Sequence, residues 1–227
     1  MQLKILSWNI WFKGDLDGVV QYVKDTSPDI IGMQEVVPER ETNILASLKA
    51  LGYQSAFTSV TELRKDGKKM GNAIFSRHKI LSSETFVLSD ENRRMAEKVV
   101  VDIGGTQLHV FNTHLMHTHQ KQSDLQDQQA DTLIRLLPKE KALLMGDLNA
   151  TPESTVVMKM KQVLNNTDLS DAPTWSMYPD GCHTCNPQAI DTRLDYIFTS
   201  KDLKTNSPAV GDSKASDHLP ISVMVEV

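Results

Sequence analysis

The segment Gly146-Asp147-Leu148-Asn149 carries a carboxylate and an amide two residues apart. It follows the apolar run 142–145, which is typical of a buried strand, and Pro152 comes soon after it. Side chains two apart in an extended chain lie on one face, so Asp147 and Asn149 should point the same way. The carboxylate could accept a proton from water while the amide holds that water or a substrate oxygen. The same residues also suit a simple turn, so the rest of the chain must decide.

Further polar residues end or open other predicted strands. They are Asn9, Glu35, His114, Asp195, Asp217 and His218. Taken singly, each is more often a turn residue, a solvated charge or a structural histidine than a reacting group. That plain interpretation would have to hold independently at every strand end, which favours a shared function. Asn9, Glu35 and Asp217 offer the oxygen ligands that a hard ion such as Mg²⁺ requires. A phosphate ester on that ion needs an oriented water and donors for its developing charge, and the remaining residues are of the right types.

The elements that must position these residues alternate between strands and helices. Apolar runs predict strands at 3–7, 29–33, 142–145, 194–199 and 221–225. Helical spacing of apolar residues predicts helices at 16–27, 44–51, 120–137 and 156–164. Residues 53–111 have the pattern of short strands, with a tight hairpin at Gly104-Gly105, and residues 167–191 are irregular. No repeat or linker interrupts the chain, so we expect a single domain over residues 1–227, with two packed sheets and helices outside.

Composition is that of an ordinary globular protein. The 227 residues are 40% hydrophobic and 23% charged, and the formal net charge of −5 argues against binding polyanions through overall charge. Two cysteines exclude a disulfide framework, and the first residues lack the apolar core of a secretion signal. No apolar stretch approaches the ~20 residues that span a bilayer. We therefore expect a cytoplasmic protein with no membrane span, and a monomer.

Six motifs, in chain order, resemble those of the endonuclease/exonuclease/phosphatase superfamily. They are Trp8-Asn9, Gln34-Glu35, Thr113-His114-Leu115, Gly146-Asp147-Leu148-Asn149, Arg193-Leu194-Asp195-Tyr196 and Ser216-Asp217-His218-Leu219-Pro220. One such motif is weak, but six in order extend over the whole chain. The resemblance implies an α/β (α+β) fold, a four-layer sandwich of two packed, mainly antiparallel β-sheets flanked by helices. It also implies hydrolysis of phosphate esters with a divalent metal, usually Mg²⁺, with Mn²⁺ as a substitute.

The resemblance assigns roles around the metal and the water. Glu35 would be the principal metal ligand, with Asn9 beside it and Asp217 in the same metal region. Asp147 would orient and deprotonate the attacking water. Asn149 would position that water or a phosphate oxygen.

The two histidines would act on the phosphoryl group. His218 would donate to its oxygens, kept cationic by Asp195, and His114 would contact a non-bridging oxygen. The sequence leaves open whether Asp147 or the His218–Asp195 pair is the general base. We favour Asp147, because a protonated His218 does more as an electrostatic donor.

The third motif narrows the substrate class. Abasic-site endonucleases of the superfamily carry a tyrosine-containing motif where this chain has Thr113-His114-Leu115, so that activity is not expected. The histidine version resembles a branch that holds sphingomyelinases, inositol-phosphate phosphatases, deadenylases and tyrosyl-DNA phosphodiesterases. We predict a phosphodiesterase acting on nucleic acid or nucleotides; the alternative is a small-molecule or lipid-headgroup phosphatase or phosphodiesterase. A non-catalytic scaffold would be expected to lose Glu35, Asp147 or His218, and all three are present.

Two basic runs and one loop are candidates for substrate specificity. The run 64–69 and Arg93-Arg94 are either solvated faces or a rim for a polyanionic substrate. Trp175 and Tyr178, in the irregular loop, would either stack on a base or pin the loop.

Four possible metal ligands fall outside the superfamily motifs. Cys182 and Cys185 offer half a zinc site, but no second cluster to complete it is evident, so we favour two thiols in local contact. His117 and His119 resemble a metal dyad on an exposed segment, and we expect them to be bystanders, although His117 could reach a substrate phosphate.

Overall fold

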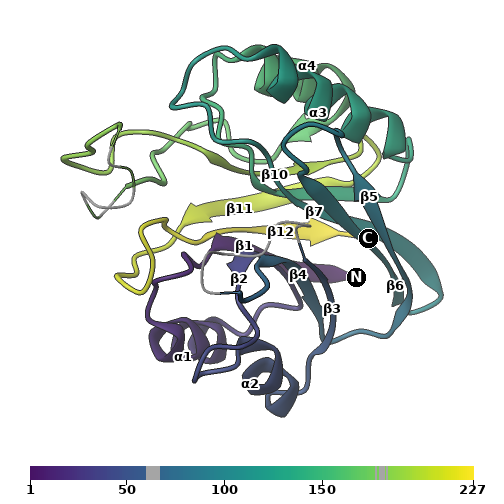
Figure 1. Cartoon of the computed structure of the whole chain (residues 1–227). Helices are drawn as coiled ribbons and strands as arrows, with labels where there is room; N and C mark the ends of the chain where they lie inside the picture. The colour runs from purple at the N-terminus through teal and green to yellow at the C-terminus, as the bar shows by residue number, and fades with distance from the viewer. Residues whose placement is uncertain (60–66, 177, 179–181, 183) are drawn as a thin grey trace.

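The structure, a computed structural model, describes residues 1–59, 67–176, 178, 182 and 184–227. Within them, two six-stranded sheets pack face to face, and helices cover both outer sides (Figure 1). The helices are α1 (Leu16–Thr26) and α2 (Ile44–Ala50) on one side, and α3 (Asp124–Leu136) and α4 (Thr155–Val163) on the other. The expected four-layer sandwich is confirmed.

Both sheets are mixed, and each contains one parallel pair. The first has the order β11 (Lys204–Val210), β12 (Ile221–Glu226), β1 (Gln2–Asn9), β2 (Ile30–Val36), β4 (Gly71–Ser76) and β3 (Gln54–Ser59). The second has the order β5 (Ile80–Val87), β6 (Met95–Ile103), β7 (Thr106–His114), β8 (Ala142–Asp147), β10 (Asp195–Thr199) and β9 (Asn165–Asn166). The parallel pairs are β1–β2, joined through α1, and β7–β8, joined through α3.

The parallel pairs determine where the polar strand ends lie. Parallel strands reach the same edge of a sheet with their carboxyl ends, which is where α/β sheets place their sites. Asn9 and His114 are the last residues of β1 and β7, Asp147 is the last of β8, and Glu35 is next to last in β2. Their antiparallel neighbours β12 and β10 begin at that edge, which lies opposite the two chain termini (Figure 1).

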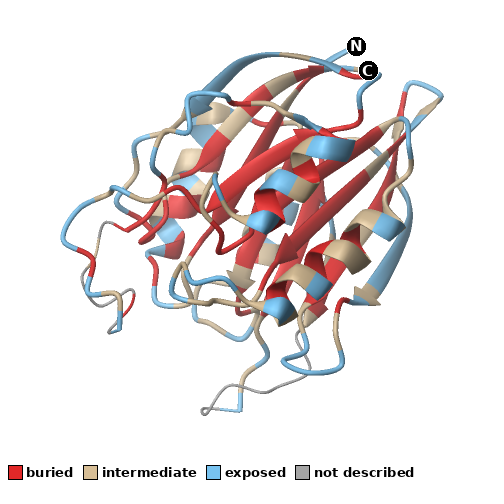
Figure 2. Ribbon diagram, turned by 90° about the horizontal axis from the view of Figure 1, so that it is seen from above, coloured by how far each residue is buried: buried red, intermediate tan, exposed pale blue. Residues whose placement is uncertain are grey.

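Three apolar clusters hold the layers together. The central one lies between the sheets and includes Ile5, Val99 and Val223, which are almost fully buried. The outer two pack α1 and α2 on the first sheet, and α3 and α4 on the second. Figure 2 shows buried strands beneath helices whose outer faces are exposed. None of the described helices is long and apolar enough to cross a membrane.

The sequence-based expectation missed the two-residue strand β9 (Asn165–Asn166) and differs from the structure in two further elements. Strand β11 was not predicted, because its residues are mostly polar and include Pro208. It is an edge strand with an irregular register, where a proline and polar side chains are tolerated. Helix α3 begins at Asp124 rather than near residue 120, because the Ser123 hydroxyl accepts from the Gln126 amide and caps the helix there.

The side chain of Glu97 is ionisable and lies buried between the two sheets. Glu97, on β6, is only 2% exposed. It lies on the same face of the strand as Val99 and Val101, which belong to the central apolar cluster. Burial raises its pKa to about 7, and a hydrogen bond from the Thr85 hydroxyl at 3.3 Å offsets this only in part. The carboxyl group is thus more basic in the folded chain than in the unfolded one.

Replacing Glu97 by glutamine should stabilise the protein at alkaline pH. The folded-state pKa is raised, so the unfolded state releases this proton first and stability falls as pH rises from about 4.5 to about 7. Above that window Glu97→Gln should raise the free energy of unfolding by about 2 kcal/mol. The gain should shrink toward zero as pH falls to about 4.5.

Urea unfolding of both proteins at pH 8 and at pH 4.5 measures this difference. Glu84→Gln is the matched control, because Glu84 lies on neighbouring β5 with its side chain 50% exposed and paired with Lys98. It should change stability by less than about 1 kcal/mol. A gain for Glu97→Gln that is equal at both pH values, or a loss at pH 8, would contradict the assignment.

Candidate active site

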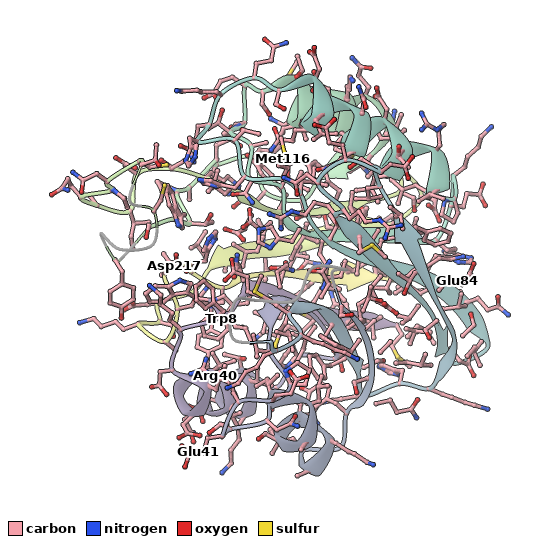
Figure 3. All side chains as sticks on the ribbon, in the orientation of Figure 1. Trp8, Arg40, Glu41, Glu84, Met116 and Asp217 are labelled. Carbon is pink, nitrogen blue, oxygen red and sulfur yellow. The ribbon has the colours of Figure 1, made fainter. Side chains whose placement is uncertain are left out.

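One cleft at the strand-end edge is lined by seven of the eight residues singled out from the sequence. They are Asn9, Glu35, His114, Asp147, Asn149, Asp217 and His218. The eighth, Asp195, lies fully buried behind His218. Asp217 is seen between the two sheets, at the opposite end of the molecule from Glu84 (Figure 3).

Asp147 lies at the centre of the hydrogen-bond network. Its Oδ2 accepts from Asn9 Nδ2 at 3.0 Å and its Oδ1 from the Asn149 amide at 2.8 Å. Burial raises its pKa, and the charge of His218 opposes that shift. Gly146 allows this placement: its φ is +149°, and an added Cβ would lie 2.0 Å from the Thr113 carbonyl oxygen.

The segment 146–149 forms a turn and also lines the cleft. Strand β8 ends at Asp147, and Asn149 has a left-handed backbone with φ of +50° rather than an extended one. The turn still directs both side chains into the same cleft. Asn149 Nδ2 donates to the Leu115 carbonyl at 3.1 Å, and its Oδ1 accepts from His117 Nδ1 at 2.7 Å, so its amide orientation is fixed at both ends.

His218 lies between two buried carboxylates. Its Nδ1 is 2.9 Å from Asp195 Oδ2, and its Nε2 is 3.7 Å from Asp147 Oδ2. Burial alone would lower the pKa of His218, but the charges of Asp195, Asp147 and Asp217 raise it far above its usual range. His218 is therefore cationic at neutral pH, with its Nδ1–H donated to Asp195.

Thr174 fixes the carboxylate behind His218. Its hydroxyl donates to Asp195 Oδ2 at 2.6 Å, while the same oxygen accepts from His218. No sequence pattern indicated Thr174, because it lies 21 residues from Asp195 in an irregular segment.

His114 lies on the other side of Asp147 and is neutral, whereas His218 is cationic. Its Nε2 is 3.4 Å from Asp147 Oδ2. Burial lowers the pKa of His114 well below its usual range, and the positive charges of Arg94 and His218 lower it further. Asp147 thus faces one cationic and one neutral imidazole.

The remaining oxygen ligands gather around Glu35. Glu35 has φ of +58° at a register shift between β2 and β4, which turns it out of the strand pairing. Its Oε2 accepts from the Phe12 amide at 3.0 Å, and its Oε1 lies 3.4 Å from Asn9 Nδ2. Asn9 therefore presents its NH₂ group to Glu35 and Asp147, since its Oδ1 accepts from the Trp11 amide.

Asp217 adds a second carboxylate in this region. Burial raises its pKa to about 6, with the charge of His218 opposing and the negative charge of Glu35 adding to the shift. Its Oδ2 accepts from Trp175 Nε1 at 3.3 Å. The negative charge of Glu35 that raises the proton affinity of Asp217 would also favour a cation bound near Asp217.

Asp147, Asp195 and His218 also lie close enough together to share an ion. A cationic imidazole has no free lone pair for a metal, and His218 already donates to Asp195. We therefore interpret this group as a hydrogen-bonded network around a cationic imidazole rather than as a metal site.

The rim of the cleft contains residues whose roles the sequence left open. Arg94 and Trp175 line it. Residues 64–66 of the first basic run and Met177 lie outside the described residues. The two thiols are in local contact, as expected, with their Sγ atoms 2.6 Å apart. The two histidines were expected to be bystanders, but His117 and His119 lie directly against Cys182 and Cys185. These pairs are more than 60 residues apart in the chain, so no local pattern could join them.

Comparison with known proteins places the chain in a family. A sequence profile described as the endonuclease/exonuclease/phosphatase family matches residues 6–218. An endonuclease/exonuclease/phosphatase from Bacteroides vulgatus superposes with a TM-score of 0.81 at 20% identity, covering 100% of this chain and 99% of that one. The protein from Beutenbergia cavernae gives the same TM-score and identity, with coverage of 100% and 72%.

The human Nocturnin catalytic domain, solved with a bound sulfate anion, is also similar. It has a TM-score of 0.76 and 21% identity, and the match covers 99% of this chain and 93% of that one. Among curated proteins, no sequence matches significantly. The profile match extends over most of the chain, and the similar structures share its fold. The protein therefore belongs to the endonuclease/exonuclease/phosphatase family.

Proposed function

We propose that this protein is a Mg²⁺-dependent phosphodiesterase acting on nucleic acid or nucleotides. Members of its family are hydrolytic phosphoesterases, which supports the reaction class. The arrangement that carries the proposal is Asp147 between cationic His218 and neutral His114, at 3.7 and 3.4 Å, beside the Glu35 carboxylate. A buried base flanked by hydrogen-bond donors suits the attack of water on a phosphate ester.

Glu35 would hold the metal ion, with Asp217 contributing to the same region. The donor set fits a hard cation, because both groups are carboxylates and their mutual repulsion is relieved by positive charge. Asn9 would join them as a ligand only after its amide turns, since its NH₂ group faces Glu35 here. A bound Mg²⁺ would neutralise charge on the phosphoryl oxygens. Mn²⁺, a similar hard ion, would serve as a substitute.

The residues on the other side of the cleft would handle the water and the phosphate. Asp147, whose burial raises its pKa, would accept a proton from the attacking water. His218 is already protonated, so it would donate to a phosphoryl oxygen rather than act as the base. Asp195 would keep that proton in place.

His114 and Asn149 would complete the water and phosphate contacts. Neutral His114 would donate one hydrogen bond to a non-bridging oxygen. Asn149, whose amide is held at both ends, would position the water or a phosphate oxygen.

Three features support a nucleotide-containing substrate. Arg94 lines the cleft and offers a cation for further phosphates. Trp11 also lines it, and its ring stacks on Tyr178 with centroids 5.5 Å apart, forming an aromatic surface on which a base could rest. Among the structural relatives, ANGEL2 is a 2′,3′-cyclic phosphatase solved with adenosine-2′,3′-vanadate. The runner-up, a small-molecule or lipid-headgroup phosphatase or phosphodiesterase, would use the same phosphate contacts without the aromatic surface.

Replacing Asp147 by asparagine should reduce kcat by at least about 100-fold, because the amide cannot accept the proton of water. Binding of Mn²⁺, measured by calorimetry, should persist if the ion rests mainly on Glu35. Asp131→Asn is the matched control, since Asp131 pairs with Lys159 on the helical side of the molecule. Near-normal turnover in Asp147→Asn would remove Asp147 from its assigned role.

Metal dependence and substrate class can be measured in one panel. It contains bis-(p-nitrophenyl) phosphate, p-nitrophenyl phosphate, single-stranded DNA, adenosine 2′,3′-cyclic phosphate and sphingomyelin. In buffers cleared of Mg²⁺ with a chelating resin, we expect no turnover, and added Mg²⁺ should restore hydrolysis of the nucleotide diesters. Glu35→Gln should abolish that restoration, whereas Glu39→Gln, at an exposed position, should not.

The panel also separates the alternatives. Preference for the phosphomonoester or for sphingomyelin would favour the runner-up. If no member is hydrolysed with either Mg²⁺ or Mn²⁺, the proposed function is wrong.

A further inference from the structure

Two histidines and two cysteines meet at the rim of the cleft. His117 and His119 follow β7, and Cys182 and Cys185 lie in the segment between β9 and β10. The four ligand atoms are His117 Nε2, His119 Nδ1, Cys182 Sγ and Cys185 Sγ, all within 4.8 Å of one another. Both cysteines are free thiols, and Cys182 is buried.

The distances between these atoms match the edges of a tetrahedron around zinc. The two nitrogens are 3.0 Å apart, and the four nitrogen–sulfur distances are 3.3, 3.5, 3.7 and 3.8 Å. Ligand bonds of ~2.0–2.1 Å to nitrogen and ~2.3 Å to sulfur give nitrogen–nitrogen and nitrogen–sulfur edges of about 3.3–3.6 Å. Five of the six edges therefore agree with a closed four-ligand site to within a few tenths of an ångström.

The sixth edge, between the two sulfurs, matches neither a disulfide bond nor a zinc site. The two Sγ atoms are 2.6 Å apart, compared with ~2.05 Å for a disulfide bond and about 3.7 Å for two zinc-bound thiolates. Zinc would open this edge by about 1 Å, which a small χ1 rotation provides. A disulfide would satisfy the two sulfurs alone and leave no reason for both imidazoles to lie against them.

His117 is prepared to act as a ligand. Its Nδ1 lies 2.7 Å from Asn149 Oδ1, an acceptor whose orientation is fixed because Asn149 Nδ2 donates to the Leu115 carbonyl. Nδ1 therefore carries the hydrogen, and Nε2 directs its lone pair toward His119 and the cysteines. Metal-bound histidines almost always donate their second nitrogen in this way.

We propose that His117, His119, Cys182 and Cys185 form a structural Zn²⁺ site that fastens the segment before β10 to the segment after β7 across the rim of the cleft. Zinc binding releases the two thiol protons, so that one Zn²⁺, two thiolates and two neutral imidazoles sum to zero net charge. That neutrality suits a site in which Cys182 packs against Trp175 and Leu194. All four positions are filled by protein ligands, so the site is structural rather than catalytic.

The site would stabilise two residues that face the cleft. Through His117 it holds Asn149, and through Cys182 it holds the Trp175 indole, whose Nε1–H donates to Asp217. The inference does not rest on the proposed function, because zinc binding by these side chains requires no turnover.

Metal analysis of the purified full-length chain tests the proposal. After incubation with ZnCl₂ and gel filtration in Mg²⁺ buffer, the wild type should retain one zinc per chain by mass spectrometry. Glu35→Gln should retain the same amount, which separates this zinc from an ion beside Glu35. Cys185→Ser and His119→Gln should lose it, and His78→Gln, a half-buried histidine paired with Asp29, should keep it.

Cobalt provides a readout that needs no variant. Co²⁺ added to the reduced, zinc-free wild type should give the intense visible bands of tetrahedral cobalt together with a thiolate charge-transfer band, and Zn²⁺ should displace it. Wild-type chain that retains no zinc, a cobalt spectrum of six-coordinate type, or Cys182 and Cys185 recovered as a disulfide from the native reduced protein would each overturn the proposal. Circular dichroism of each variant checks that it is folded.

Discussion

His218 lies between two buried carboxylates, donating to Asp195 at 2.9 Å and facing Asp147 at 3.7 Å. Two carboxylates buried this close together require a cation beside them, because burial strongly disfavours isolated charge. The cationic imidazole meets that requirement, and Thr174 fixes its partner Asp195. Burial also raises the proton affinity of Asp147, and a raised proton affinity is the property required of a base near neutral pH.

The topology explains why these groups meet. Each sheet contains one parallel pair, so four strands from two sheets bring their carboxyl ends to one edge. The antiparallel neighbours β10 and β12 begin there and add Asp195 and the Asp217–His218 segment. The apolar cluster between the two sheets holds their strand-end edges side by side. The site is therefore formed by the interface between the sheets, and neither sheet alone contains it.

Much of this arrangement could be predicted from the chain. Polar residues that end apolar runs are visible in sequence, and their order matched a known pattern, so the fold and the location of the cleft-lining residues followed. The prediction of a shared face for Asp147 and Asn149 rested on continued extension of the strand, whereas a left-handed turn produces the same result. The resemblance already implied a cationic His218. The lowered pKa of His114 could not be predicted, because it depends on burial and on the nearby charges of Arg94 and His218.

Contacts between segments that are distant in the chain could not be predicted from the sequence. His119 and Cys182 are 63 residues apart, and each pair alone has a plain explanation. Only their meeting at the rim gives the four ligands of a closed metal site.

Anomalous diffraction from a crystal grown with Mn²⁺ and inorganic phosphate tests the proposed active site most directly. We predict a manganese peak on the Glu35 carboxylate with phosphate beside His114 and His218. Manganese bound between Asp147 and Asp195, or phosphate held away from both histidines, would contradict it.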